Sequence, residues 1–277
     1  MTASPTDLPV DFAFADGLTI PRMGFGAMRL TGQPGNFGPY ADPEGGVALV
    51  RRALELGVRH LDTARAYGPH ENERLIRSAL AGAPSGADAA FVATKGGIEK
   101  GSPDDIRRDG SPAALRRHVD ESLGNLGVEA IDLYYLHGPD ARVPIAESVG
   151  ALEEARRAGK ILRIGLSNVD SAQLDEAREV APIAAVQNRY SPADDPDDAL
   201  EALIDRTAEL GIAFVAHGPL GAHPMRAGAA TDPAAALGAL LARSPNVLVI
   251  PGTTSVRHLE ANVAALAPDR RDAPGRA

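Results

Sequence analysis

The chain has no cysteine and no tryptophan, and aromatic residues make up only 4% of its 277 residues. Without cysteine, disulfides, thiolate catalysis and cysteine-based metal sites are excluded. No stretch of 18 uninterrupted apolar residues occurs, and the first residues lack the charged and apolar regions of a signal peptide. We therefore expect a soluble, untargeted, cytoplasmic protein with no membrane partner and no metal site.

Basic residues are also fewer than acidic ones. Lys and Arg number 28 against 37 Asp and Glu, which gives a formal net charge of -9. Such a chain does not attract nucleic acid or anionic membranes through its overall field. Any phosphate group that it binds must be held by a local site.

What the sequence does contain is one repeating unit: a short apolar run, a loop, an amphipathic helical stretch and then a glycine. Gly57, Gly127, Gly159 and Gly211 each follow a Leu- and Ala-rich segment and precede the next apolar run. Glycine is typical of the left-handed residue that ends a helix. Each predicted helix thus leads directly into a predicted strand.

Eight short runs are apolar on both faces, as parallel strands covered by helices should be. They span 23–30, 59–64, 90–95, 131–137, 161–167, 183–188, 212–217 and 246–252. Eight strands alternating with helices favour an α/β fold, a (β/α)8 TIM barrel formed by one domain over 1–277. An open doubly wound sheet is the alternative from pattern alone.

The two ends of the chain differ from this repeat. Before the first strand, "VDFAF" and "LTIPR" flank Asp16-Gly17 and predict a β-hairpin that caps the barrel floor. The polar, Pro- and Gly-rich tail 267–277 is expected to be disordered.

Polar residues stand at the ends of the predicted strands, where active sites of such barrels lie. They are Asp62, Thr63, Lys95, His137, Ser167, Asn168, Gln187, Asn188 and His217. Taken singly, Lys95 with Asp62 is compatible with a structural ion pair, and His137 with a satisfied core histidine. Together with Tyr67 they suggest catalysis, because a nearby ammonium stabilises phenolate and lowers the tyrosine pKa toward the working range.

Six motifs in register carry a family resemblance. "DTARAYGPHENE", "FVATKGG", "IDLYYLHGPD", "GKILRIGLSNVDSAQL", "VQNRYSP" and "VIPGTTSVRHLEANV" resemble the aldo-keto reductase superfamily from about residue 18 to residue 266. The resemblance implies an NADPH-dependent carbonyl reductase. It implies that Tyr67 donates the proton, that Asp62 and Lys95 tune it, and that His137 positions the substrate oxygen.

The same resemblance implies an NADP site. Ser167, Asn168 and Gln187 would hold the nicotinamide carboxamide, although "SN" is also compatible with a helix N-cap unless Asp170 or Ser171 caps the helix. The remaining implied cofactor residues follow the seventh and eighth strands. They are His217, Gly218, Pro219, Leu220, Gly252, Thr253, Thr254, Ser255, Arg257, His258 and Asn262.

Three positions depart from the family pattern. Gly252 replaces a lysine that many members have, and His258 replaces an arginine, which leaves the preference for NADP over NAD open unless Arg257 substitutes. His217 stands where a tyrosine or tryptophan usually stacks on the nicotinamide.

The substrate is expected to be a small carbonyl compound. Candidates to line its pocket are Met28, Arg29, Phe37, Tyr40, Arg65, Tyr134 and His223. Arg29 and Arg65 would favour an anionic or polar substrate, or else are ordinary solvated arginines.

Two other functions stay open. The first is a dehydrogenase that oxidises a vitamin-like or sugar alcohol, because "IPGT" resembles members assigned to pyridoxal or sugar-lactone chemistry. The second is a non-catalytic regulatory subunit that resembles the potassium-channel β subunits. By the same resemblance we expect a monomer.

Overall fold

Eight parallel strands form a barrel in this computed structural model, which describes residues 10–82, 89–192, 197–221 and 232–266. In sheet order the strands are β3 (Phe25–Gly26), β4 (His60–Asp62), β5 (Phe91–Gly96), β8 (Leu133–Leu136), β9 (Ile164–Ser167), β10 (Ile183–Arg189), β11 (Ala213–His217) and β12 (Val247–Val249). A parallel bridge between Met23 and Val249 joins the last strand to the first. The predicted (β/α)8 barrel is therefore confirmed, and the open sheet is not formed.

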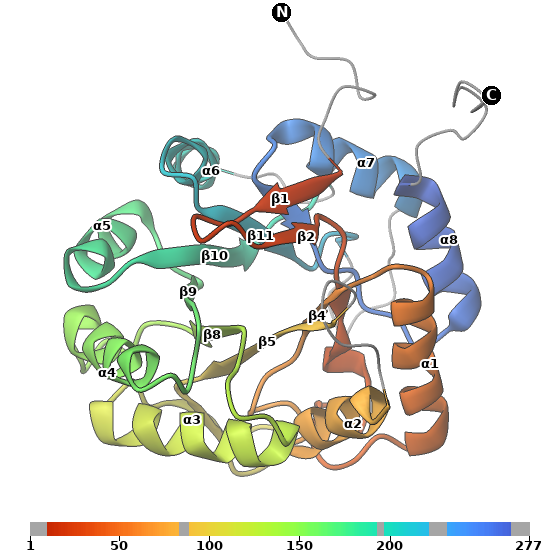
Figure 1. Cartoon of the computed structure of the whole chain (residues 1–277), viewed down its shortest axis with the longest axis horizontal. Helices are drawn as coiled ribbons and strands as arrows, with labels where there is room; N and C mark the ends of the chain where they lie inside the picture. The colour runs from red at the N-terminus through yellow and green to blue at the C-terminus, as the bar shows by residue number, and fades with distance from the viewer. Residues whose placement is uncertain (1–9, 83–88, 193–196, 222–231, 267–277) are drawn as a thin grey trace, which may run out of the picture.

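Helices surround the strands on the outside (Figure 1). They are α1 (Pro43–Glu55), α2 (Glu71–Leu80), α3 (Pro112–Leu126), α4 (Ile145–Arg157), α5 (Ser171–Val180), α6 (Asp198–Glu209), α7 (Pro233–Arg243) and α8 (Val256–Leu266). The four glycines predicted to end helices all have positive φ, between 68° and 89°. Within the described ranges, no helix has the length and apolar character needed to cross a membrane.

Two apolar layers hold the barrel together. The larger layer lies between strands and helices and includes Leu49, Val50, Leu61 and Ile76. The smaller layer contains residues such as Phe91, Tyr135 and Val215. Because side chains alternate along a strand, one strand supplies both layers.

The N-terminal hairpin closes one end of the barrel. Strands β1 (Asp11–Ala13) and β2 (Thr19–Pro21) pair antiparallel and cross in front of the barrel strands in Figure 1. Phe12, Phe14 and Ile20 from this hairpin belong to the smaller apolar cluster. Arg163, directly before β9, places its guanidinium 5.1 Å from the Phe14 ring and pairs with Asp16. The predicted floor cap is thus present.

Two segments differ from the predicted strands. The run 23–30 is a strand only at Phe25–Gly26, and residues Ala27–Arg29 form a 3-10 turn, η2. The side-chain amide of Asn72 donates to the carbonyls of Ala27 and Leu30, which holds this turn in place. An unpredicted hairpin, β6 (Ile98–Lys100) and β7 (Ile106–Arg108), follows β5. The tail 267–277 lies outside the described residues.

Candidate active site

A cavity of about 850 Å³ opens at the carboxyl ends of the barrel strands. Sixteen of the eighteen residues predicted as catalytic or cofactor-binding line it, the exceptions being Lys95 and Arg257. The sixteen are Asp62, Tyr67, His137, Ser167, Asn168, Gln187, His217, Gly218, Pro219, Leu220, Gly252, Thr253, Thr254, Ser255, His258 and Asn262. Residues far apart in the sequence are thus brought to one site, because parallel strands end on the same side of the barrel.

A buried ion pair lies beneath the cavity, which Asp62 lines and Lys95 does not. Lys95 Nζ lies 2.5 Å from Asp62 Oδ1 and donates to the carbonyl of Thr63 at 2.8 Å. Both side chains are almost fully buried. Burial alone would lower the pKa of Lys95, but Asp62 and the Tyr67 hydroxyl together raise it above its ordinary value. The lysine is therefore a cation at neutral pH.

Tyr67 lies above this pair on the loop between β4 and α2. The Lys95 ammonium is 5.2 Å from the centre of the Tyr67 ring, and Asn72 donates its backbone N–H to the Tyr67 carbonyl. Burial raises the pKa of Tyr67, Asp62 raises it further, and Lys95 only partly opposes them. The expected net lowering of this pKa is therefore wrong here, because desolvation of the phenolate outweighs the ammonium.

His137 faces Tyr67 from the end of β8. The two ring centres are 5.8 Å apart and nearly perpendicular, and the backbone N–H of His137 donates to the Gly96 carbonyl at 2.8 Å. Burial, followed by electrostatic interactions with Lys95, His217 and Arg108, holds the pKa of His137 well below its usual range. The imidazole is neutral at pH 7 and can donate a hydrogen bond without being an acid.

Amide and hydroxyl groups line the next part of the cavity. Asn168, with φ of 57°, donates through Nδ2 to Ser167 Oγ and to the His137 carbonyl. His217 Nε2 lies 3.3 Å from Asn168 Oδ1. The N-cap of α5 is Asp170, which forms a capping box with Gln173, so Ser167 and Asn168 are not needed as caps.

The far end of the cavity meets the start of α8. Thr253 Oγ1 accepts from the Ser255 N–H at 3.0 Å, and Ser255 Oγ accepts from the His258 N–H at 3.4 Å. No acidic residue occupies the first turn of α8, so the helix dipole there is free to favour an anion. His258 lines the cavity, whereas Arg257 lies outside its lining.

Gly252 has a packing reason. A Cβ at this position would lie 2.7 Å from the carbonyl oxygen of Gly26, where the last strand segment closes against the first. The Gly26 N–H in turn donates to Pro251 O at 3.2 Å. Close packing where the barrel closes therefore explains why residue 252 is glycine. The absence of the expected lysine does not by itself indicate a cofactor preference.

Only some of the residues predicted to line the substrate pocket do so. Met28 and Arg29 line the cavity, but Phe37 and Tyr40 do not. His223 lies outside the described residues.

Two further pocket predictions are wrong. Tyr134 is fully buried in the layer between strands and helices, because its neighbour Tyr135 takes the interior side of β8. Arg65 turns away from the cavity and pairs with Glu99 at 3.0 Å and with Glu121. These two carboxylates supply the reason, since together they satisfy the guanidinium in a site that is only 6% exposed.

Several lining residues were not predicted. They are Gly26, Arg189, Pro233, Ile250, Pro251 and Ala261. Arg189 follows Gln187 and Asn188 in the motif "VQNRYSP", and its charge at a strand end was a usable signal. The others carry no chemistry that the sequence could reveal.

Comparison with known proteins agrees with this geometry. A sequence profile described as the aldo/keto reductase family matches residues 22–239. Pyridoxine 4-dehydrogenase from Escherichia coli is 42% identical over 264 residues, covering 89% of this chain and 90% of that protein.

Solved structures give the same fold. A glycerol dehydrogenase from Gluconobacter oxydans superposes with a TM-score of 0.77 at 24% identity, covering 97% of this chain and 99% of the other. An aldo-keto reductase from Klebsiella pneumoniae in complex with NADPH has a TM-score of 0.72 at 24% identity, covering 92% and 89%. From the sequence match and the shared barrel together, the chain belongs to the aldo/keto reductase family.

Proposed function

We propose that this protein is an NADP(H)-dependent oxidoreductase that reduces an aldehyde or ketone to an alcohol, with Tyr67 as proton donor. The observation that carries the proposal is the grouping of Tyr67 and neutral His137 over the buried Lys95–Asp62 pair, at one wall of a cavity large enough for a cofactor and a small substrate.

The residues present fit a nicotinamide dinucleotide phosphate. The first turn of α8 and the hydroxyls of Thr253, Thr254 and Ser255 suit a phosphate, and the first turn carries no repelling carboxylate. Asn262 is 5% exposed, lines the same end of the cavity and suits the adenine. Ser167, Asn168 and Gln187 suit the carboxamide at the other end.

The chemistry divides between the cofactor and the chain. NADPH, when bound, supplies the hydride that adds to the carbonyl carbon. Tyr67 Oη donates its proton to the carbonyl oxygen, so the C=O bond becomes an alcohol. His137 donates a hydrogen bond that orients the same oxygen, and Lys95 stabilises the phenolate left on Tyr67.

For the substrate, we propose pyridoxal, which is reduced to pyridoxine. The support is the 42% identity to a protein named pyridoxine 4-dehydrogenase, which extends over nine-tenths of both chains. The reverse reaction, from pyridoxine to pyridoxal, is the oxidation of a vitamin-like alcohol. Because a catalyst accelerates both directions, cofactor ratio decides which one proceeds.

The test combines binding with turnover. NADPH and NADH are titrated by fluorescence, and turnover of pyridoxal and a panel of small aldehydes is followed for wild type and Tyr67→Phe. We expect NADPH binding in both proteins and turnover in wild type alone. Binding without turnover of any carbonyl or alcohol would overturn the catalytic proposal, and tighter binding of NADH would overturn the cofactor assignment.

A further inference from the structure

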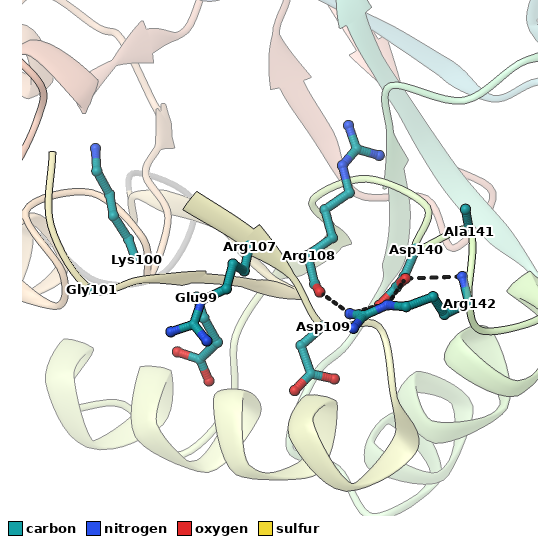
Figure 2. A pocket seen from close by; sticks show the side chains of 9 residues that line it. All are labelled: Glu99, Lys100, Gly101, Arg107, Arg108, Asp109, Asp140, Ala141 and Arg142. Carbon is teal, nitrogen blue, oxygen red and sulfur yellow. Dashed lines mark hydrogen bonds and ion pairs between the residues drawn. The ribbon is translucent and has the colours of Figure 1, made fainter. Parts of the chain in front are cut away.

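A second cavity lies beside the catalytic one. The β6–β7 hairpin and the segment 140–142 enclose about 740 Å³ of space (Figure 2). The chain runs from the catalytic cavity into this outer cavity within a few residues, because His137 lines the first and Asp140 lines the second. Only Gly138 and Pro139 separate the two linings along this segment.

Arg108, at the end of β7, spans this boundary. Its Nη1 donates to the carbonyl of Pro139 at 2.6 Å. A Cβ on Gly138 would lie 2.8 Å from the same Nη1 and 3.0 Å from Cζ, so the guanidinium packs directly against the residue after His137. Figure 2 shows Arg108 extending to the opposite side of β7 from Arg107, as strand alternation requires.

The other cations around the outer cavity already have partners. Arg142 pairs with Asp140 at 2.9 Å, and Arg107 pairs with Asp105 at 3.0 Å. Lys100 donates to the backbone carbonyls of Gly35 and Asn36. Their charges or donors are thus engaged within the protein.

Arg108 differs from these neighbours. Its side chain is exposed, and among the residues that the structure describes it makes no ion pair. Its one described acceptor is a neutral carbonyl, which leaves the remaining guanidinium N–H groups for a ligand. Its charge reaches the catalytic centre, since it is one of the charges that lower the pKa of His137.

We propose that Arg108 forms an outer subsite for an anionic group, through which the enzyme, besides pyridoxal, binds aldehydes that carry a carboxylate or a phosphate away from the carbonyl. The carbonyl lies at Tyr67 and His137, and the anionic end passes Gly138 to reach the guanidinium. A guanidinium fork matches either oxyanion. This inference rests on the carbonyl reduction proposed above.

The test compares an anionic aldehyde with its neutral isostere. 4-Carboxybenzaldehyde and methyl 4-formylbenzoate have similar shape and a similarly activated carbonyl, and both are assayed with NADPH. We expect Arg108→Gln to lower kcat/KM for the acid about tenfold, mainly through KM, as the loss of one charge-assisted hydrogen bond predicts. Turnover of the ester should change less than about twofold, which also shows that the variant is folded.

Two further variants locate the effect. Arg107→Gln removes an equal charge from the same strand, and Arg29→Gln removes the guanidinium that lines the inner cavity. An equal loss in Arg107→Gln would mean a diffuse field, and a loss confined to Arg29→Gln would place the anion in the inner cavity. Either result, or an equal loss for acid and ester in Arg108→Gln, would overturn the subsite.

A phosphate arm and a wild-type control complete the design. Pyridoxal 5'-phosphate against pyridoxal tests whether phosphate uses the same residue, and a loss for the acid alone would assign the subsite to carboxylates. Wild type that reduces neither benzaldehyde nor pyridoxal derivatives would refute the proposed function itself. Wild type that reduces both, with Arg108→Gln unchanged, would refute only the subsite.

Discussion

The side-chain amide of Gln187 donates a hydrogen bond of 2.7 Å to Oδ2 of Asp62, from β10 to β4 across the barrel. Asp62 Oδ1 is held by Lys95, so both carboxylate oxygens have fixed partners. Only the nitrogen of the Gln187 amide can donate to a carboxylate, and this fixes its orientation. Its oxygen remains to accept a hydrogen bond. If Gln187 contacts the nicotinamide carboxamide, as proposed, it therefore does so as a hydrogen-bond acceptor.

Replacing Gln187 by glutamate should disrupt this arrangement. The Gln187→Glu variant places a second buried carboxylate against Asp62, and one of the two must take up a proton. We expect a loss of about 2–3 kcal/mol in the free energy of unfolding at pH 7. Because the introduced carboxyl has a raised pKa in the folded state, stability should fall as pH rises from 5 to 8.

Urea denaturation across this pH range checks the expectation, with Gln187→Met as the uncharged control. The methionine variant should lose the hydrogen bond without acquiring the pH dependence. If both variants show the same pH profile, the Asp62–Gln187 contact does not govern the effect.

The raised pKa of Tyr67 predicts the pH dependence of catalysis. Since the pKa of the phenol is raised above its ordinary value of about 10, the rate of carbonyl reduction should be level from about pH 6 to 9 and fall only above about pH 10. Tyr67→Phe should slow reduction by about 10²–10⁴-fold at every pH. Single-turnover kinetics at saturating NADPH measures both, and a wild-type midpoint between pH 7 and 8 would show that Lys95 dominates during turnover.

Much of the fold follows from local chemistry. The glycines that end helices, the apolar runs and the Asp16-Gly17 turn all depend on interactions between residues close in the sequence. The barrel and its floor hairpin could therefore be predicted. The β6–β7 hairpin was not, because "IEKGSPDDIRRD" has no apolar face and its strands are exposed or partly exposed. That the whole chain forms one domain stays a prediction.

Site residues could be predicted where the end of a strand fixes the position of the side chain. They were harder to predict where contacts with residues distant in the sequence set its orientation. Arg65 pairs with carboxylates 34 and 56 residues away, which no local pattern reveals. In "LYYL" the two tyrosines are equivalent by sequence, yet Tyr135 takes the interior and Tyr134 the outer layer. The direction of the Tyr67 pKa shift likewise cannot be predicted from residue spacing, because it depends on how deeply the phenol is buried.

Restoring the family's lysine at position 252 should harm the protein. In Gly252→Lys the new Cβ meets the backbone oxygen of Gly26, which cannot move without opening the barrel seam. We expect a loss of about 1–3 kcal/mol in unfolding free energy and no tighter binding of NADPH. Gly252→Ala separates the Cβ from the charge and should show the same loss. Tighter NADPH binding with unchanged stability in Gly252→Lys would contradict this reason for the glycine.

His60 should make the protein sensitive to acid. Its ring is buried on β4, and among the described residues neither ring nitrogen has a hydrogen-bond partner. Burial above all lowers the pKa of His60 to about 4; Asp62 opposes this shift and Lys95 adds to it. In the unfolded chain the pKa of His60 has its ordinary value of about 6.5. Below that pH the unfolded chain therefore binds a proton at His60 that the folded protein does not bind.

Stability should therefore fall as pH drops from about 6.5 to about 4, with His60 contributing up to about 3 kcal/mol of the loss. Urea denaturation of wild type and His60→Leu between pH 7 and 4.5 measures this contribution, because carboxylates elsewhere titrate equally in both proteins. Leucine gives up the edge contact with Phe91 and has no titratable group, so the stability of wild type relative to His60→Leu should fall as the pH falls. Parallel profiles would show that His60 finds a proton acceptor in the folded protein. A fall in the stability of wild type relative to His60→Leu would mean that the layer beneath the Lys95–Asp62 pair must stay uncharged, since His60 precedes Asp62 by two residues and shares its face of the strand.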